Sequence, residues 1–170
     1  HTKTTSRMEE LKEKYNIRLT ESNAAVAREA DFLILAVKPI VYEEAIMQIR
    51  SLLKDGTILL GIAPAYSISM LQKLIANEKV KIARSIPNTP TLIGKGIAGV
   101  CFSSDMGADD KELVLGLFNS FGAGIEIREE LMPAVGTLTG SGPAYGYMFI
   151  EAMAQADRKS TRLNSSHGII

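Results

Sequence analysis

Short apolar segments alternate along the chain with longer segments in which apolar residues recur at helical spacing. The short segments are rich in β-branched residues, which favour strands, and they lie at residues 32–37, 57–62, 80–86, 97–102 and 124–127. The first two, FLILAV and TILLGI, have no polar alternation. We therefore expect both faces of these two strands to be covered.

Helical periodicity fills the stretches between the strands, at residues 41–53, 67–77 and 109–121. Each predicted helix carries one apolar stripe, and the stripe residues are Val41, Ala45, Ile46, Ile49, Leu52, Leu53, Met70, Leu71, Leu74, Ile75, Leu113, Leu117 and Phe121. Strands and helices in alternation predict crossover connections. The expected fold class is therefore α/β, with a doubly wound, Rossmann-like, mainly parallel sheet that has helices on both sides.

Both ends of this pattern differ from a complete nucleotide-binding domain. Such a domain usually starts with a strand and a glycine-rich turn, whereas here a polar segment leads into a predicted helix at residues 8–15. An apolar helix predicted at residues 143–156 is followed by DRKSTRLNSSH, which resembles the translation of a sequencing adapter. We therefore expect a truncated chain in which residues 157–170 are a non-native tail.

Composition narrows the possible classes of function. The 170 residues include 19 basic and 19 acidic side chains, and this zero net charge argues against a nucleic-acid partner. No apolar run approaches the roughly 18 residues of a membrane span, so we expect a cytoplasmic protein without a membrane partner. The single cysteine, Cys101, lies in an apolar segment and is predicted to be a buried structural thiol. His1 and His167 lie at or near the ends, so no histidine-based metal site is predicted.

Two proline-containing loops follow predicted strands, where an open α/β sheet binds its ligands. Residues 36–39 (AVKP) place Lys38 on a stiff turn, which suits either a ribose or phosphate contact or a plain solvated turn. Residues 87–90 (PNTP) hold an amide and a hydroxyl between two prolines. These groups either hydrogen-bond a nicotinamide or simply belong to a proline-rich turn without a ligand.

A third loop, at residues 139–145 (TGSGPAY), precedes the last predicted helix. Its glycines permit close backbone approach, Ser141 is a capping residue, and Pro143 suits the first helical position. The helix would then present free N–H groups to a small carboxylate. The alternative is a capped helix without a ligand.

The order and spacing of AVKP, R-x-I-PNTP from Arg84, and GSGPAY resemble the pyrroline-5-carboxylate reductases over residues 1–156. The resemblance implies reduction of 1-pyrroline-5-carboxylate to L-proline, the last step of proline biosynthesis, with NADPH or NADH as cofactor. It also implies a truncated NADP-binding domain at residues 1–128 and the start of a helical substrate and dimerisation domain at residues 129–156. The full-length protein would be a homodimer or larger homo-oligomer, and the chain as it stands an inactive fragment.

The resemblance further implies which residues form the site. Those expected to bind the cofactor are Thr2, Lys3, Ala36, Val37, Lys38, Pro39, Ala63, Asn88 and Thr89. Those expected to bind the substrate are Ser141, Gly142 and Pro143 at its carboxylate and Glu129 near its ring nitrogen. No side chain is expected to act as a strong catalytic acid or base, because hydride transfer to a protonated imine needs mainly orientation.

The sequence departs from the family pattern at a turn near the expected cofactor site, and two alternative functions stay open. Pro64 lies in a turn where the family commonly has Ala-Ala-Gly, and it removes a backbone donor that would face the cofactor. The first alternative is a related NADP-dependent imine or 2-hydroxyacid reductase. The β-hydroxyacid type usually has a lysine in the helix after the substrate loop, and residues 143–156 contain none. The second is a catalytically silent dinucleotide-binding module.

Overall fold

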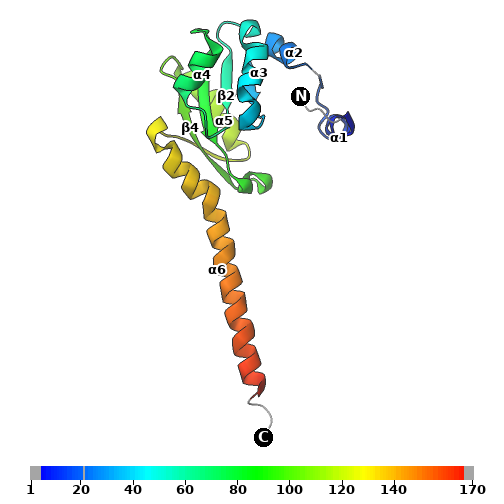
Figure 1. Ribbon diagram of the computed structural model, residues 1–170, viewed down its shortest axis with the longest axis vertical. Helices are drawn as coiled ribbons and strands as arrows, with labels where there is room; N and C mark the ends of the chain where they lie inside the picture. Colours follow the sequence, from blue (N-terminus) through cyan, green and yellow to red (C-terminus); the bar gives the residue numbers. More distant parts are fainter. Residues whose placement is uncertain (1–4, 21, 167–170) are drawn as a thin grey trace.

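The computed structural model describes residues 5–20 and 22–166, and its centre is one five-stranded sheet with the order β1-β2-β3-β4-β5 (Figure 1). The strands are β1 (Phe32–Leu35), β2 (Ile58–Gly61), β3 (Lys81–Ile86), β4 (Gly96–Phe102) and β5 (Gly122–Glu126). β1, β2 and β3 are parallel, β4 runs antiparallel to β3, and β5 is parallel to β4. The predicted α/β fold with a mainly parallel sheet is confirmed.

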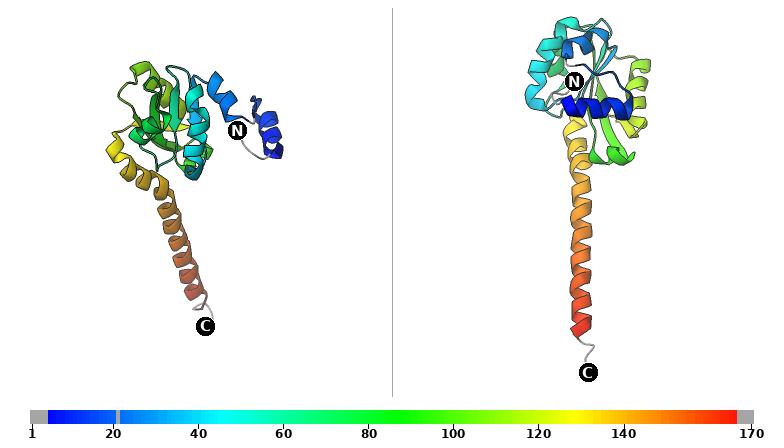
Figure 2. Two further views of the ribbon diagram at one scale, coloured as in Figure 1. Left: turned by 45° about the horizontal axis from the view of Figure 1, so that its top comes forward. Right: turned by 90° about the vertical axis from the view of Figure 1, so that its right-hand side faces the viewer.

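Helices cover both faces of the sheet. One face packs against α2 (Asn23–Glu29), α3 (Tyr42–Ile49) and α4 (Ile68–Ile75), and the other packs against α5 (Ala108–Asn119). Short 3-10 helices are η1 (Pro39–Val41), η2 (Arg50–Leu52), η3 (Thr89–Ile93) and η4 (Glu129–Leu131). The remaining helix before the sheet, α1 (Thr5–Tyr15), lies apart from it in Figure 1 and in the left view of Figure 2.

The predicted apolar stripes hold for most positions but not for all of them. In the stripe predicted at residues 41–53, Ala45, Ile46, Ile49 and Leu53 are buried, whereas Val41 is exposed. Leu71 and Ile75 are buried, whereas Met70 is 44% exposed and Leu113 is 56% exposed. On α5 the fully buried positions are Val114 and Phe118. Where apolar residues occupy successive positions, two overlapping apolar stripes can be drawn on the helix. Packing against the sheet decides which of the two is buried.

β1 is less covered than predicted, and α2 was not predicted at all. β2 is buried at every position, but Ile34 in β1 is 43% exposed because β1 forms an edge of the described sheet. Ser22 caps the start of α2, and its hydroxyl accepts a hydrogen bond from the Ala25 N–H. This cap signal was present in the sequence.

The last helix, α6 (Met132–Ser166), starts beside the sheet and projects far beyond it (Figure 1). The prediction that a helix begins at Pro143 is wrong, since Pro143 lies inside α6, which also runs into the predicted tail. Two glycines allow the first turns of α6 to lie close to the sheet. A Cβ at Gly136 would be 3.0 Å from Ile86 Cδ1, and a Cβ at Gly99 would be 2.8 Å from Val135 Cγ1.

Candidate functional site at the carboxyl edge of the sheet

The three loops that follow β1, β2 and β3 meet at one edge of the sheet because these strands are parallel. They are residues 36–39, 62–65 and 87–90. Ala36, Lys38, Pro39 and Thr89 are exposed there, whereas Ala63 is buried. The structure therefore brings together all the predicted cofactor residues that it describes, and Thr2 and Lys3 lie outside the described residues.

Tyr42 joins the ends of β1 and β2 at this edge. Its buried hydroxyl donates to the Leu35 carbonyl at 2.7 Å and accepts from the Ile62 N–H at 3.1 Å. The ring stacks on that of Tyr66, with centroids 4.8 Å apart, and the Tyr66 hydroxyl donates to the Pro39 carbonyl at 3.3 Å. Burial raises the pKa of Tyr42 above its ordinary value, against the hydrogen bond from Ile62. The hydroxyl thus stays neutral and fixes two of the three loops.

Replacing Tyr42 with phenylalanine is expected to lower the free energy of unfolding by about 1–2 kcal/mol, because the Leu35 carbonyl and Ile62 N–H lose a buried partner. Urea denaturation monitored by circular dichroism measures the loss. The control is Tyr66→Phe, which removes a longer hydrogen bond from a half-buried ring and should cost clearly less. Equal losses in the two variants would contradict the bridging role of Tyr42.

Arg84 forms a second connection beneath the same edge. Its Nη2 donates to the Pro64 carbonyl, and its Nη1 donates to Glu129 Oε1 at 3.0 Å. The same Glu129 oxygen accepts from the Ile68 N–H at 2.8 Å, at the start of α4. Pro64 has no N–H to donate, but its carbonyl is held in place by the buried guanidinium of Arg84.

Cys101 lies opposite Arg84 in the β3–β4 pairing and is 3% exposed, so the predicted buried thiol is confirmed. Burial raises the pKa of Cys101 to about 11, the Glu129 charge adds to this, and Arg84 opposes it. A thiol in this state is protonated at neutral pH and is a poor nucleophile.

A cavity of about 420 Å³ lies between this edge and α6. Pro64, Arg84 and Ile86 line it from the sheet, and Met132, Gly136 and Ser141 line it from α6. Ser141 is thus the predicted substrate residue that shares a cavity with the cofactor edge. Arg84 and Gly136 were not predicted to lie here, although a charged residue within an apolar strand segment was a visible signal for Arg84.

The other predicted substrate residues lie in different surroundings. Glu129 lines a separate cavity, on the α4 side, and its Oε1 is engaged by Arg84 and Ile68. Gly142 and Pro143 follow Ser141 within α6, so the free N–H groups expected at a helix start are absent from residues 141–144. A Cβ at Gly142 would meet no heavy atom within 4 Å, so packing in the described chain does not require glycine there.

Residues 94–99 (GKGIAG) match the spacing of a dinucleotide-binding glycine motif, which the sequence reasoning overlooked. The structure excludes that role. Gly94 ends η3, and Gly96 and Gly99 lie within β4, so the motif leads into a strand, whereas a phosphate-binding turn follows a strand and opens a helix.

Neither a membrane-spanning helix nor a metal-binding cluster is found in the described ranges, 5–20 and 22–166. Within them, no helix is both long and apolar enough to cross a membrane. The same residues contain no group of three or more histidine, cysteine, aspartate or glutamate side chains arranged to hold a metal ion.

Two family models match separate parts of the chain. Residues 1–65 match "NADP oxidoreductase coenzyme F420-dependent", and residues 129–162 match "Pyrroline-5-carboxylate reductase dimerisation". The second match covers the start of α6 and much of its length. The first match includes the edge loops at residues 36–39 and 62–65, and the second includes the α6 residues that line the cavity.

Known proteins similar to the chain agree with these matches. The pyrroline-5-carboxylate reductase of Escherichia coli K12 is 34% identical over 146 residues, which are 86% of this chain and 54% of the relative. A solved reductase of this name from Coxiella burnetii has a TM-score of 0.87 at 25% identity and covers 93% of this chain and 59% of its own. The Plasmodium falciparum enzyme, solved with NADP bound, has a TM-score of 0.75 at 34% identity, over 83% of this chain and 53% of its own.

The chain spans about half the length of the curated relatives it matches. The similarity extends through all three carboxyl-edge loops and into α6. The chain therefore belongs to the pyrroline-5-carboxylate reductase family.

Proposed function

We propose that this chain is part of an enzyme that reduces 1-pyrroline-5-carboxylate to L-proline with NADPH, or with NADH. The observation that carries the proposal is the cavity between the carboxyl edge and α6, because Ser141 of the substrate motif shares it with Pro64, in the turn expected to face the cofactor. In this reading, residues 1–128 belong to the nucleotide-binding domain and residues 129–156 begin the helical domain. The cytoplasm stays the predicted location.

The residues at the edge fit a nicotinamide cofactor. Ala36, Pro39, Pro64 and Ala65 offer small exposed side chains with no charge that would oppose a flat ring, and Lys38 adds one exposed cation. We assign Ala36 to Pro39, Ala63 and the Asn88–Thr89 turn to the cofactor surface. When bound, the cofactor would supply a hydride to the C=N carbon of the substrate.

The chain's own residues would then act by orientation. Ser141 offers a hydroxyl from α6, and Gly142 leaves the neighbouring surface open to a small carboxylate. Tyr42 and Arg84 hold the loops on the cofactor side. Glu129 near the substrate ring nitrogen stays a prediction. Fixing two reactants in position can supply several kcal/mol of the barrier reduction, which removes the need for a strong acid–base pair.

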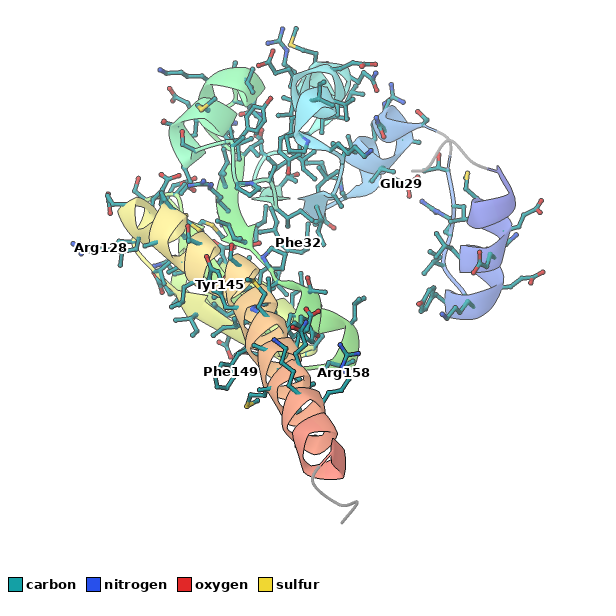
Figure 3. All side chains as sticks on the ribbon, turned by 60° about the horizontal axis from the view of Figure 1, so that its bottom comes forward. Glu29, Phe32, Arg128, Tyr145, Phe149 and Arg158 are labelled. Carbon is teal, nitrogen blue, oxygen red and sulfur yellow. The ribbon has the colours of Figure 1, made fainter. Side chains whose placement is uncertain are left out.

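The exposed part of α6 supports assembly of the protein into a homodimer or larger homo-oligomer. Large apolar side chains lie exposed along it, and these are Leu138, Tyr145, Tyr147, Met148, Phe149, Ile150 and Met153. Figure 3 shows Tyr145 and Phe149 on the part of α6 beyond the sheet. An apolar surface of this extent is typical of a protein interface. We propose that a second copy of the chain covers it.

The test uses a full-length form, in which the chain is joined to the segments that the E. coli relative has outside the matched residues. NADPH oxidation is followed with pyrroline-5-carboxylate, in the unsubstituted protein and in the double variant Ser141→Ala/Gly142→Ala. We expect turnover, and a KM for the substrate that rises about tenfold or more in the double variant, since a carboxylate contact is lost. Neither alanine disturbs packing, because a Cβ at 142 meets no neighbour within 4 Å and alanine favours a helix.

The matched control is Ser51→Ala, which changes an exposed serine outside both the Ser141 and the Glu129 cavities and should leave the kinetics unchanged. Turnover of another cyclic imine or a 2-hydroxyacid, with none for pyrroline-5-carboxylate, would establish the first alternative function. Cofactor binding without any turnover would establish the silent binding module.

A further inference from the structure

The side chain of Asn88 connects the loop after β3 to the first turns of α6. Its Nδ2 donates to the Thr139 carbonyl at 3.0 Å, across 51 positions of sequence. Its Oδ1 accepts from the Ile97 N–H at 2.9 Å, at the start of β4. One half-buried amide thus bonds to both the sheet and the helix.

Pro143 explains why the Thr139 carbonyl is available. In an α-helix this carbonyl accepts from the N–H four residues later, which here would be residue 143. Proline has no N–H, so the bond within the helix cannot form. The Thr139 hydroxyl bonds elsewhere, to the Val135 carbonyl at 2.8 Å. The Asn88 amide therefore supplies the donor that Pro143 removes.

The same side of α6 is shaped for close contact along several turns. Met132, Gly136, Thr139 and Pro143 follow one another at spacings of three or four residues and so lie on one face of the helix. Met132 is fully buried, and a Cβ at Gly136 would be 3.0 Å from Ile86 Cδ1. The Asn88–Thr139 bond is the polar contact at the end of an otherwise apolar seam.

We propose that Asn88 is a positioning residue, which sets the placement of α6 on the nucleotide-binding domain through the carbonyl that Pro143 leaves free. On the proposed function, this placement fixes the distance between Ser141 and the cofactor edge. The PNTP and GSGPAY motifs are then two halves of one connection. The side chain of Asn88 acts on the helix, and its main chain forms the cofactor-side turn.

A thermodynamic cycle on the chain itself tests the connection without any assay of activity. Asn88→Asp keeps the acceptor for Ile97 and loses the donor to Thr139, so we expect the Tm to fall by roughly 3–8 °C. Pro143→Ala restores an N–H that can bond to the Thr139 carbonyl. In that background Asn88→Asp should lower the Tm by less than about half as much. The control is Asn119→Asp, because Asn119 uses its Oδ1 on the Gly124 N–H and should lose little.

Kinetics of the full-length form test the consequence for catalysis. Asn88→Asp is expected to lower kcat about tenfold or more while the KM for NADPH changes by less than about twofold, because a small displacement of Ser141 disturbs orientation more than cofactor binding. Equal Tm losses in the two backgrounds, or none in either, would overturn the connection. If the Tm loss is smaller in the Pro143→Ala background, as expected, but kcat is unchanged, the positioning role of Asn88 is overturned. If the Tm losses are as expected but the full-length protein turns over no pyrroline-5-carboxylate, the connection stands and the proposed function is refuted.

Discussion

Replacing Arg84 with methionine is expected to lower the free energy of unfolding by about 3 kcal/mol. The Arg84 side chain is 9% exposed, and its loss leaves the Pro64 carbonyl without its donor and the Glu129 carboxylate without its cation. Breaking a buried ion pair costs about 3–5 kcal/mol, and the lower end applies because the Glu129 side chain is 31% exposed. Guanidinium denaturation measures the change.

The exposed pair of Lys79 and Asp55 supplies the control for this prediction. Lys79→Met should leave stability nearly unchanged, because both side chains are largely in water. Glu129→Gln should cost less than Arg84→Met, since the amide oxygen still accepts from the Ile68 N–H. A loss in Arg84→Met no larger than that in Lys79→Met would show that the buried pair does not hold the Pro64 turn.

Replacing Leu71 with alanine is expected to lower the free energy of unfolding by about 3 kcal/mol. Leu71 on α4 is fully buried against the end of β2, where a Cβ at Gly61 would be 3.1 Å from Leu71 Cδ1. Truncation of a buried leucine costs about 2–5 kcal/mol, through lost transfer energy and the cavity left behind. Thermal unfolding followed by circular dichroism checks this value.

Leu113→Ala on α5 is the matched comparison for Leu71→Ala. Leu113 is 56% exposed, and alanine is the better helix former, so stability should change by no more than about 0.5 kcal/mol. The sequence pattern alone predicts similar losses at the two leucines, because both lie on a predicted stripe. A similar loss in both variants would therefore support the sequence pattern against the observed packing.

Periodicity was sufficient to predict the sheet and most of its helices, because each strand has a distinct apolar segment. It was not sufficient where two apolar stripes overlap, as at Val114 and Leu113, since only contact with the sheet selects one of them. The start of α6 was missed for a different reason. A proline after a serine and glycines has the pattern of a helix start, and the group that bonds to the Thr139 carbonyl in place of the missing N–H is Asn88, far away in sequence.

The candidate site was predictable in part. The loops at residues 36–39 and 87–90 were expected at one edge because they follow strands of a parallel sheet, and the structure confirms that placement. The third expected loop, at residues 139–145, lies inside α6 instead. The partners of Glu129 and Pro64 were not predictable, because both depend on where the Arg84 side chain points within the fold. A strand pattern gives the face of a residue but not the group that it meets on that face.

The reversed direction of β4 separates one turn of the molecule from the site. Because β4 is antiparallel to β3, it ends beside the start of β3, where the Ser103 N–H donates to the Ile82 carbonyl. Residues 103–107 therefore connect to α5 at the edge of the sheet opposite to the three loops. Ser104 and Asp105 in this turn are exposed, so a fluorescent reporter or an affinity tag inserted between them would leave the cofactor edge and α6 unobstructed.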